Sequence, residues 1–132
     1  MQGVLLLWLA AGGDRALIEA RAQALELAPL VAGTSSALSL LVLEAPEREL
    51  PLEVRFSADA GFELLEDRLD WSAVVDPLAL QPRLSVPFRA PEQPGEYRIT
   101  ASVDYSVCSE QWCRRKHGEV AWTVVVQAAA TD

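Results

Sequence analysis

Apolar and polar residues alternate with a period of two along much of this chain. The clearest run lies in residues 97–107, where polar or small residues separate Tyr97, Ile99, Ala101, Val103, Tyr105 and Val107. A period of two is typical of a β-strand with one buried face. Weaker runs bounded by turn-forming residues predict further strands over residues 37–43, 52–56, 83–89 and 119–127, with a short strand inside the loop 61–71. Pro87 interrupts one run, which predicts an edge strand there.

These runs predict an all-β protein. Six or seven short strands separated by turn signals are typical of an antiparallel β-sandwich, and we expect an immunoglobulin-like one. Three consecutive valines, residues 124–126, indicate a strand buried on both faces. Trp71, Tyr97 and Trp122 are expected in the core because large aromatic side chains bury the most apolar surface.

The first 27 residues allow more than one interpretation. Residues 4–11 are apolar and precede Gly12-Gly13, as in a secretion signal, but no Lys or Arg comes before them. Segment 1–13 is therefore a signal with a misassigned start, a packed N-terminal extension or an appended stretch, and residues 14–132 form one domain. Within 14–27, residue composition and Asp14 as N-cap favour a helix. Alternation over residues 20–27 favours a strand, which we prefer.

Composition narrows the function classes. The chain has 132 residues, 51% of them hydrophobic, and a formal net charge of −8. That length supports one domain with a proper core, and the acidic balance disfavours binding to nucleic acid or to an anionic membrane. The sequence contains no run of 18 or more consecutive apolar residues, so it predicts no transmembrane helix. The motifs of hydrolases and phosphate-binding loops are missing, and one histidine with two cysteines cannot supply the four ligands of a structural zinc.

The two cysteines are the most informative feature. Cys108 lies at the end of one predicted strand and Cys113 near the start of the next, with four residues between them. A hairpin brings such positions face to face, so a disulfide is feasible. Closing a loop of about six residues stabilises a fold by only ~2 kcal/mol, which is modest for a staple, and a short, exposed bridge is the kind that exchanges readily. The residues alone leave three interpretations open: a redox-active pair, a structural staple, or a reduced cytosolic pair.

A family resemblance bears on this choice. Pro29 to Gly33 precede an apolar strand, Gly61-Phe62 lie in an aromatic loop, and residues 94–97 (Pro-Gly-Glu-Tyr) lead into the segment 103–108 that ends at Cys108. With these features, residues 20–127 resemble the N-terminal periplasmic domain of DsbD-type thiol:disulfide interchange proteins. The resemblance implies an immunoglobulin-like fold that exchanges disulfides with a thioredoxin-like partner, in the periplasm or elsewhere outside the cytoplasm, with Cys108 and Cys113 as the redox pair. It implies no metal and no organic cofactor.

The charges around the pair suggest different roles for the two cysteines. Cys113 precedes the cations Arg114, Arg115 and Lys116, which would favour its thiolate, whereas Glu110 lies near Cys108. We therefore expect Cys113 to start exchange and Cys108 to resolve the mixed disulfide. His117 is expected in the turn and not as a ligand or base.

Three further residues are candidates for modulating the site. Alternation places Asp104 on the same strand face as Cys108, where its carboxylate could tune or relay a proton to the pair. Trp112 lies in the hairpin loop as either a contact surface or a packing residue. Phe62 corresponds to a loop that caps the cysteines in the resembling family, with a core role as the alternative.

A different class of function also fits the sequence. The chain is then a non-catalytic immunoglobulin-like binding module, and its hairpin disulfide is structural. The reduction potential of the cysteine pair distinguishes the two functions.

Overall fold

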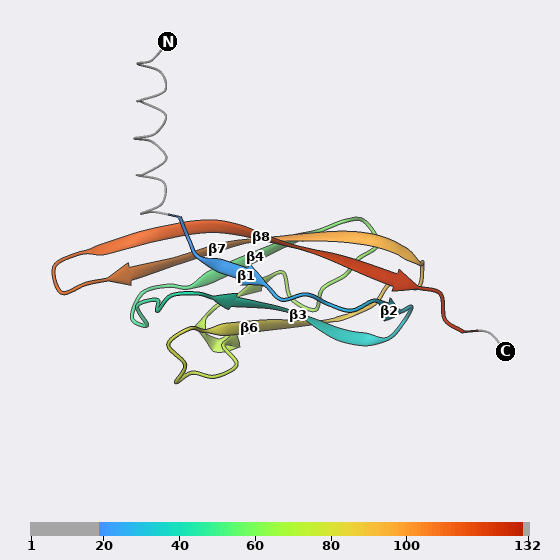
Figure 1. Cartoon of the computed structure of the whole chain (residues 1–132), viewed down its shortest axis with the longest axis horizontal. Helices are drawn as coiled ribbons and strands as arrows, with labels where there is room; N and C mark the ends of the chain where they lie inside the picture. Colours follow the sequence, from blue (N-terminus) through green and yellow to red (C-terminus); the bar gives the residue numbers. More distant parts are fainter. Residues whose placement is uncertain (1–18, 131–132) are drawn as a thin grey trace, which may run out of the picture.

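The computed structural model describes residues 19–130, and the predictions for segment 1–13 and for a helix capped by Asp14 fall on residues outside that range. The described chain is a β-sandwich of two layers (Figure 1). Its elements are β1 (Ala22–Ala24), β2 (Leu30–Val31), β3 (Ser35–Val42), β4 (Glu53–Ala58), β5 (Arg68–Leu69), the 3-10 turn η1 (Trp71–Ala73), β6 (Arg83–Arg89), β7 (Gly95–Cys108) and β8 (Cys113–Gln127).

The strands form two sheets. The smaller has the order β1-β3-β6 and the larger the order β2-β8-β7-β4-β5. Neighbouring strands are antiparallel except β2 and β8, which are parallel. The N-terminal segment therefore contributes to both layers, since β1 pairs with β3 and β2 with β8. The immunoglobulin-like sandwich predicted from the alternation is confirmed.

The core lies between the sheets and is built from the inward positions that alternation predicts. Along β7 the side chains of Ile99, Ala101, Val103 and Tyr105 are almost completely buried, and the polar residues between them face outward. Trp122 and Tyr97 are buried as expected, whereas Trp71 is half-buried at the rim and donates its indole N–H to the Leu50 carbonyl at 2.8 Å. Trp122 spans the layers, because its indole N–H reaches the Ser39 carbonyl in β3 at 3.1 Å.

Most strands lie where the pattern places them. The strand that contains Pro87 is β6, and it is the edge of the three-stranded sheet, as predicted. The strand expected over residues 20–27 shortens to Ala22–Ala24, because the chain there leaves one sheet for the other.

Two expectations for β8 are wrong. The strand begins at Cys113, six residues before the predicted start, and His117 lies inside it instead of in a turn. The charged run 114–117 hides the alternation, and it is a strand because its backbone pairs with residues 104–107 of β7. Val125 is half-exposed, so the valine run is not buried on both faces; only Val124 and Val126 point into the core.

Candidate functional site

The β7–β8 hairpin extends beyond the rest of its sheet and forms an arm, which we define as residues 105–116. The last residue of β7 that pairs with β4 is Asp104, so beyond it the sheet consists of the two strands of the arm (Figure 1). One backbone bond reaches the arm from outside, since the Glu47 amide of the β3–β4 loop donates to the Ser106 carbonyl at 2.7 Å. Cys108 and Cys113 face each other at the end of the arm and form a disulfide. Beyond them, the Ser109 amide donates to the Trp112 carbonyl at 2.8 Å and closes the turn. We call residues 108–115 the tip of the arm.

A buried polar network holds the base of the arm. The Tyr105 hydroxyl donates to the Glu44 carboxylate and accepts the Arg21 backbone N–H at 2.8 Å. Lys116 donates to the same carboxylate at 2.9 Å, and only 12% of the lysine side chain and 16% of the glutamate side chain are exposed. Burial, together with the hydrogen bond to Glu44, raises the pKa of Tyr105 well above its ordinary value of 10.0. The network therefore fastens the arm to the β3–β4 loop and to the N-terminal segment.

Asp104 shares a face with the cysteines, as alternation predicts, but it does not contact them. It lies four residues from Cys108, which is about 13 Å along a strand. Its carboxylate is 2.8 Å from Nδ1 of His117, directly opposite in β8. Asp104 and His117 thus form an exposed cross-strand pair at the root of the arm.

The cations that follow Cys113 mostly have other partners. The Arg114 guanidinium lies over the Trp112 ring, 5.0 Å from its centroid. Lys116 turns inward to Glu44, and His117 pairs with Asp104. The structure thus gives three of the four basic side chains a role other than stabilising a thiolate, and in the disulfide neither cysteine has a thiol to titrate.

Phe62 lies far from the cysteine pair. Gly61, with φ of +88°, turns the loop after β4 so that the Phe62 ring enters the core, where it packs on Phe88 at 4.9 Å and on Tyr97 at 5.8 Å between ring centroids. Tyr97 and Cys108 are eleven residues apart on one strand, about 36 Å. Phe62 therefore cannot cap the disulfide, and the structure corrects that expectation in favour of the core role.

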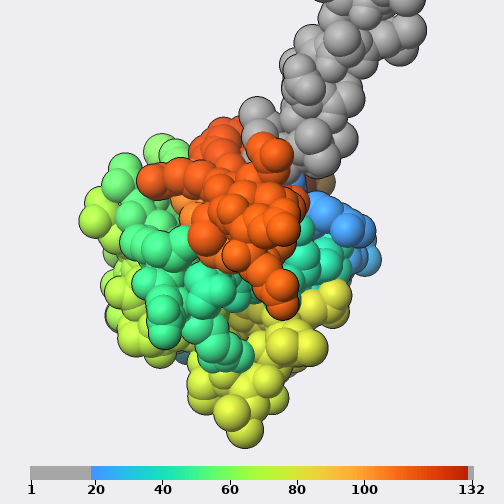
Figure 2. All heavy atoms as spheres, turned by 90° about the vertical axis from the view of Figure 1, so that its left-hand side faces the viewer, coloured from blue at the N-terminus to red at the C-terminus, as the bar shows by residue number. Residues whose placement is uncertain are grey.

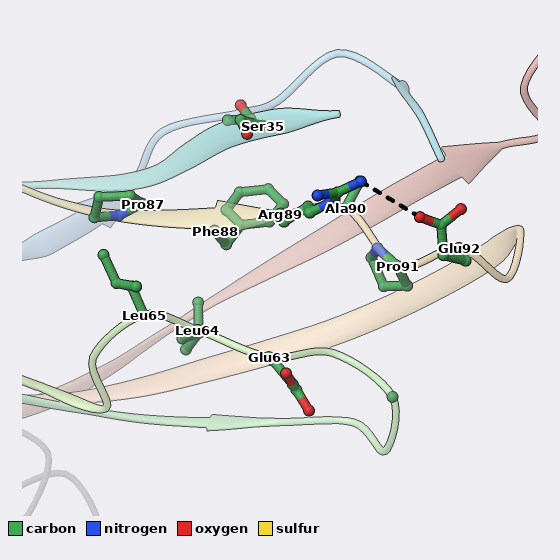
Figure 3. A pocket seen from close by; sticks show the side chains of 12 residues that line it. Ser35, Glu63, Leu64, Leu65, Pro87, Phe88, Arg89, Ala90, Pro91 and Glu92 are labelled. Atoms are coloured by element: carbon green, nitrogen blue, oxygen red, sulfur yellow. Dashed lines mark ion pairs between the residues drawn. The ribbon is translucent and has the colours of Figure 1, made fainter. Parts of the chain in front are cut away.

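Beside Phe62 the surface is hollowed. A groove of about 510 Å³ runs between the loop after β4 and the C-terminal half of β6 (Figure 3). Leu64 and Leu65 lie on one side and Pro87 on the other, while Arg89 and Glu92 form an exposed ion pair of 3.7 Å at one end.

The end of the sandwich that carries the arm also holds residues that the sequence did not mark. Figure 2 views this end, with the arm in orange, the β3–β4 loop in green beside it and the loop between η1 and β6 in yellow below. In that last loop Val75, Leu78 and Leu80 are exposed, Leu78 by 88%. Asp76 braces it by accepting the Leu78 amide at 3.0 Å. Neither these leucines nor Glu44 belongs to a recognisable motif, so only the tertiary structure reveals them.

Two kinds of feature, clusters of metal-ligating side chains and membrane-spanning helices, are absent from the described residues. Among residues 19–130 no group of three His, Cys, Asp or Glu side chains is placed to hold a metal ion. Over the same range no helix has the length and apolar character needed to cross a membrane.

No protein-family model and no curated protein sequence matches the chain. Among solved structures it is similar to native alpha-2-macroglobulin from Escherichia coli, in a crystal structure spanning domain MG7 to the C-terminus, with a TM-score of 0.53 and 22% identity over 85% of this chain and 17% of that one. It is also similar to Salmonella alpha-2-macroglobulin reacted with methylamine, with a TM-score of 0.52 and 25% identity over 83% of this chain and 7% of that one. The chain thus spans less than a fifth of either protein.

These similarities correct the family inferred from the sequence. The structural neighbours are macroglobulin domains with an immunoglobulin-like fold, and the resemblance to the DsbD-type domain is wrong. Its fold expectation holds because any immunoglobulin-like hairpin supplies the same turn, alternating strand and facing pair of positions.

Proposed function

We propose that this chain is a non-catalytic immunoglobulin-like module that binds another protein, and that the Cys108–Cys113 bridge is a structural staple of its arm. The observation that carries this proposal is the fixing of the arm at both ends. Glu44 anchors Tyr105 and Lys116 at the base, and the disulfide closes the tip. A rigid element that projects beyond its sheet suits recognition, because little conformational freedom is lost on binding.

The neighbouring structures support this proposal at the level of fold. In the macroglobulins a domain of this shape is a small part of a much longer chain. We infer that this domain works through contacts with other domains or proteins. A disulfide at an exposed tip also suits an oxidising compartment, so we place residues 14–132 outside the cytoplasm as one binding domain.

Thiol exchange is the function to be excluded, and it can be tested directly. The oxidised protein is mixed with a thioredoxin that lacks its resolving cysteine, and mixed disulfides are counted on a non-reducing gel. The matched control is the double variant Cys108→Ser/Cys113→Ser, which keeps the fold but cannot exchange. We expect no more covalent complex than a short peptide with the same cysteine spacing gives.

A covalent complex that forms much faster than with the peptide would contradict the proposal, since the fold would then promote attack on the bridge. The double variant supplies a second result. Its free energy of unfolding should fall by about 2 kcal/mol, the loop-closure contribution of a bridge between residues five apart.

A further inference from the structure

We propose that the tip of the arm docks an acidic segment of a partner protein that also presents an apolar side chain, with Trp112, Arg114 and Arg115 as the contact residues. This inference rests on the proposed function and names the surface and the partner chemistry for it.

Trp112 is the first support. It is 46% exposed although it lies in a hydrogen-bonded turn, and the Arg114 guanidinium lies over one face of its ring. Tryptophan and arginine are the residue types that most often dominate the energy of protein interfaces. The stacked pair offers one large apolar surface with a cation held against it, which suits a partner carrying an apolar side chain next to a carboxylate.

The charge of the tip is the second support. Within residues 19–130 neither Arg114 nor Arg115 has an ion-pair partner, while the other ion pairs of this region use Lys116 and His117. The chain as a whole has a net charge of −8. The two arginines lie on opposite faces of β8, because successive residues of a strand point to opposite sides. The turn carries one carboxylate of its own, Glu110, against these two cations, so an acidic segment that crosses the tip meets an excess of positive charge.

The rigidity of the tip is the third support. Besides the disulfide and the Ser109–Trp112 bond, the Ser109 hydroxyl accepts the amides of Gln111 at 3.2 Å and Trp112 at 3.3 Å. The backbone that carries the tryptophan is thus fixed before any partner arrives. Ordering costs that a flexible loop incurs on binding are largely avoided.

The experiment uses a phage-displayed library of random twelve-residue peptides as the probe. The library is selected on the oxidised protein, and the enriched peptides are then measured against Trp112→Ala and against Arg114→Gln/Arg115→Gln. Two controls make matched changes elsewhere: Leu78→Ala removes an exposed apolar side chain from another loop, and Arg98→Gln removes an exposed cation from the opposite end of β7. Because all these positions are at the surface, the variants should keep the fold, which circular dichroism verifies.

We expect the enriched peptides to combine Asp or Glu with an aromatic or aliphatic residue. Trp112→Ala should weaken their binding about thirtyfold, the size of an interface hot spot, and the double arginine variant should weaken it and flatten its salt dependence. The two controls should bind as the wild type does. Peptides without acidic residues, or binding that the tip variants leave unchanged, would overturn the inference.

Two other outcomes are also decisive. Vesicles containing phosphatidylserine should not bind the protein, and tip-dependent binding to them would show that the arginines serve an anionic lipid surface instead. If the thioredoxin experiment excludes exchange while the selected peptides bind elsewhere on the protein, the docking tip is refuted and the binding module stands.

Discussion

Replacing Tyr105 by Phe tests the anchoring of the arm most sharply. The change keeps the ring in the core but removes a hydroxyl that donates to the Glu44 carboxylate and accepts the Arg21 amide. Each buried group left without a partner costs about 1–3 kcal/mol, and Lys116 still satisfies part of the carboxylate. We therefore expect the free energy of unfolding to fall by about 2–3 kcal/mol at pH 7.

The loss should also depend on pH in a defined direction. The folded protein raises the pKa of Tyr105, so the hydroxyl stays protonated at pH values where the unfolded chain ionises, above about 10. The stability that this hydroxyl contributes is fully present below pH 10 and is lost as the pH rises further. At pH 10.8 the advantage of the wild type over the variant should therefore have shrunk by about 1 kcal/mol.

The assay is urea unfolding followed by tryptophan fluorescence at pH 7, 9 and 10.8, for both proteins with the disulfide intact. Tyr97→Phe is the matched control, because that hydroxyl donates only to the Gln93 carbonyl at 2.5 Å, at the far end of β7. Tyr97→Phe should lower the free energy of unfolding by less than Tyr105→Phe does. Two results would refute the anchoring network: a difference in free energy of unfolding between the wild type and Tyr105→Phe that stays constant up to pH 10.8, or one below about 0.5 kcal/mol at pH 7.

Three further predictions concern other parts of the fold. Gly118→Ala should destabilise the protein by about 1–3 kcal/mol in urea unfolding, since the added Cβ would lie 3.0 Å from the Cβ of Ala20; an unchanged midpoint would contradict the close packing there. Phe62→Ala should cost about 3–5 kcal/mol by the same assay, as a core aromatic does, without altering the rate at which dithiothreitol reduces the disulfide; a faster reduction would restore its capping role. Asp104→Asn should change stability by less than about 1 kcal/mol, because the His117 side chain of the pair is 60% exposed; a loss above 2 kcal/mol would reveal a larger role.

The sequence predicted the strands well because alternation directly reports which face is buried. It placed β6 at its observed bounds and recognised β7 almost entirely. It missed the first six residues of β8 because the basic run 114–117 breaks the alternation, and only backbone pairing with β7 makes that run a strand.

Of the candidate site, only the disulfide was predictable from the sequence. The spacing of Cys108 and Cys113 predicted a hairpin in which a bridge is feasible, and the structure closes it. The partners of Tyr105 and Lys116 were not predictable, since Glu44 lies 61 and 72 residues away from them in a segment of scattered carboxylates. The family resemblance failed for a related reason: its motifs describe a local hairpin, which many immunoglobulin-like domains share.

The most direct test of the central claim compares the reduction potential of the disulfide in the folded protein with that in urea-denatured protein. If the bridge is a structural staple, folding and bridging stabilise each other by about 2 kcal/mol, so the potential of the folded protein should be about 40 mV more negative. A folded potential that is equal to or less negative than the denatured one would mean that the fold favours the dithiol, and it would contradict the account.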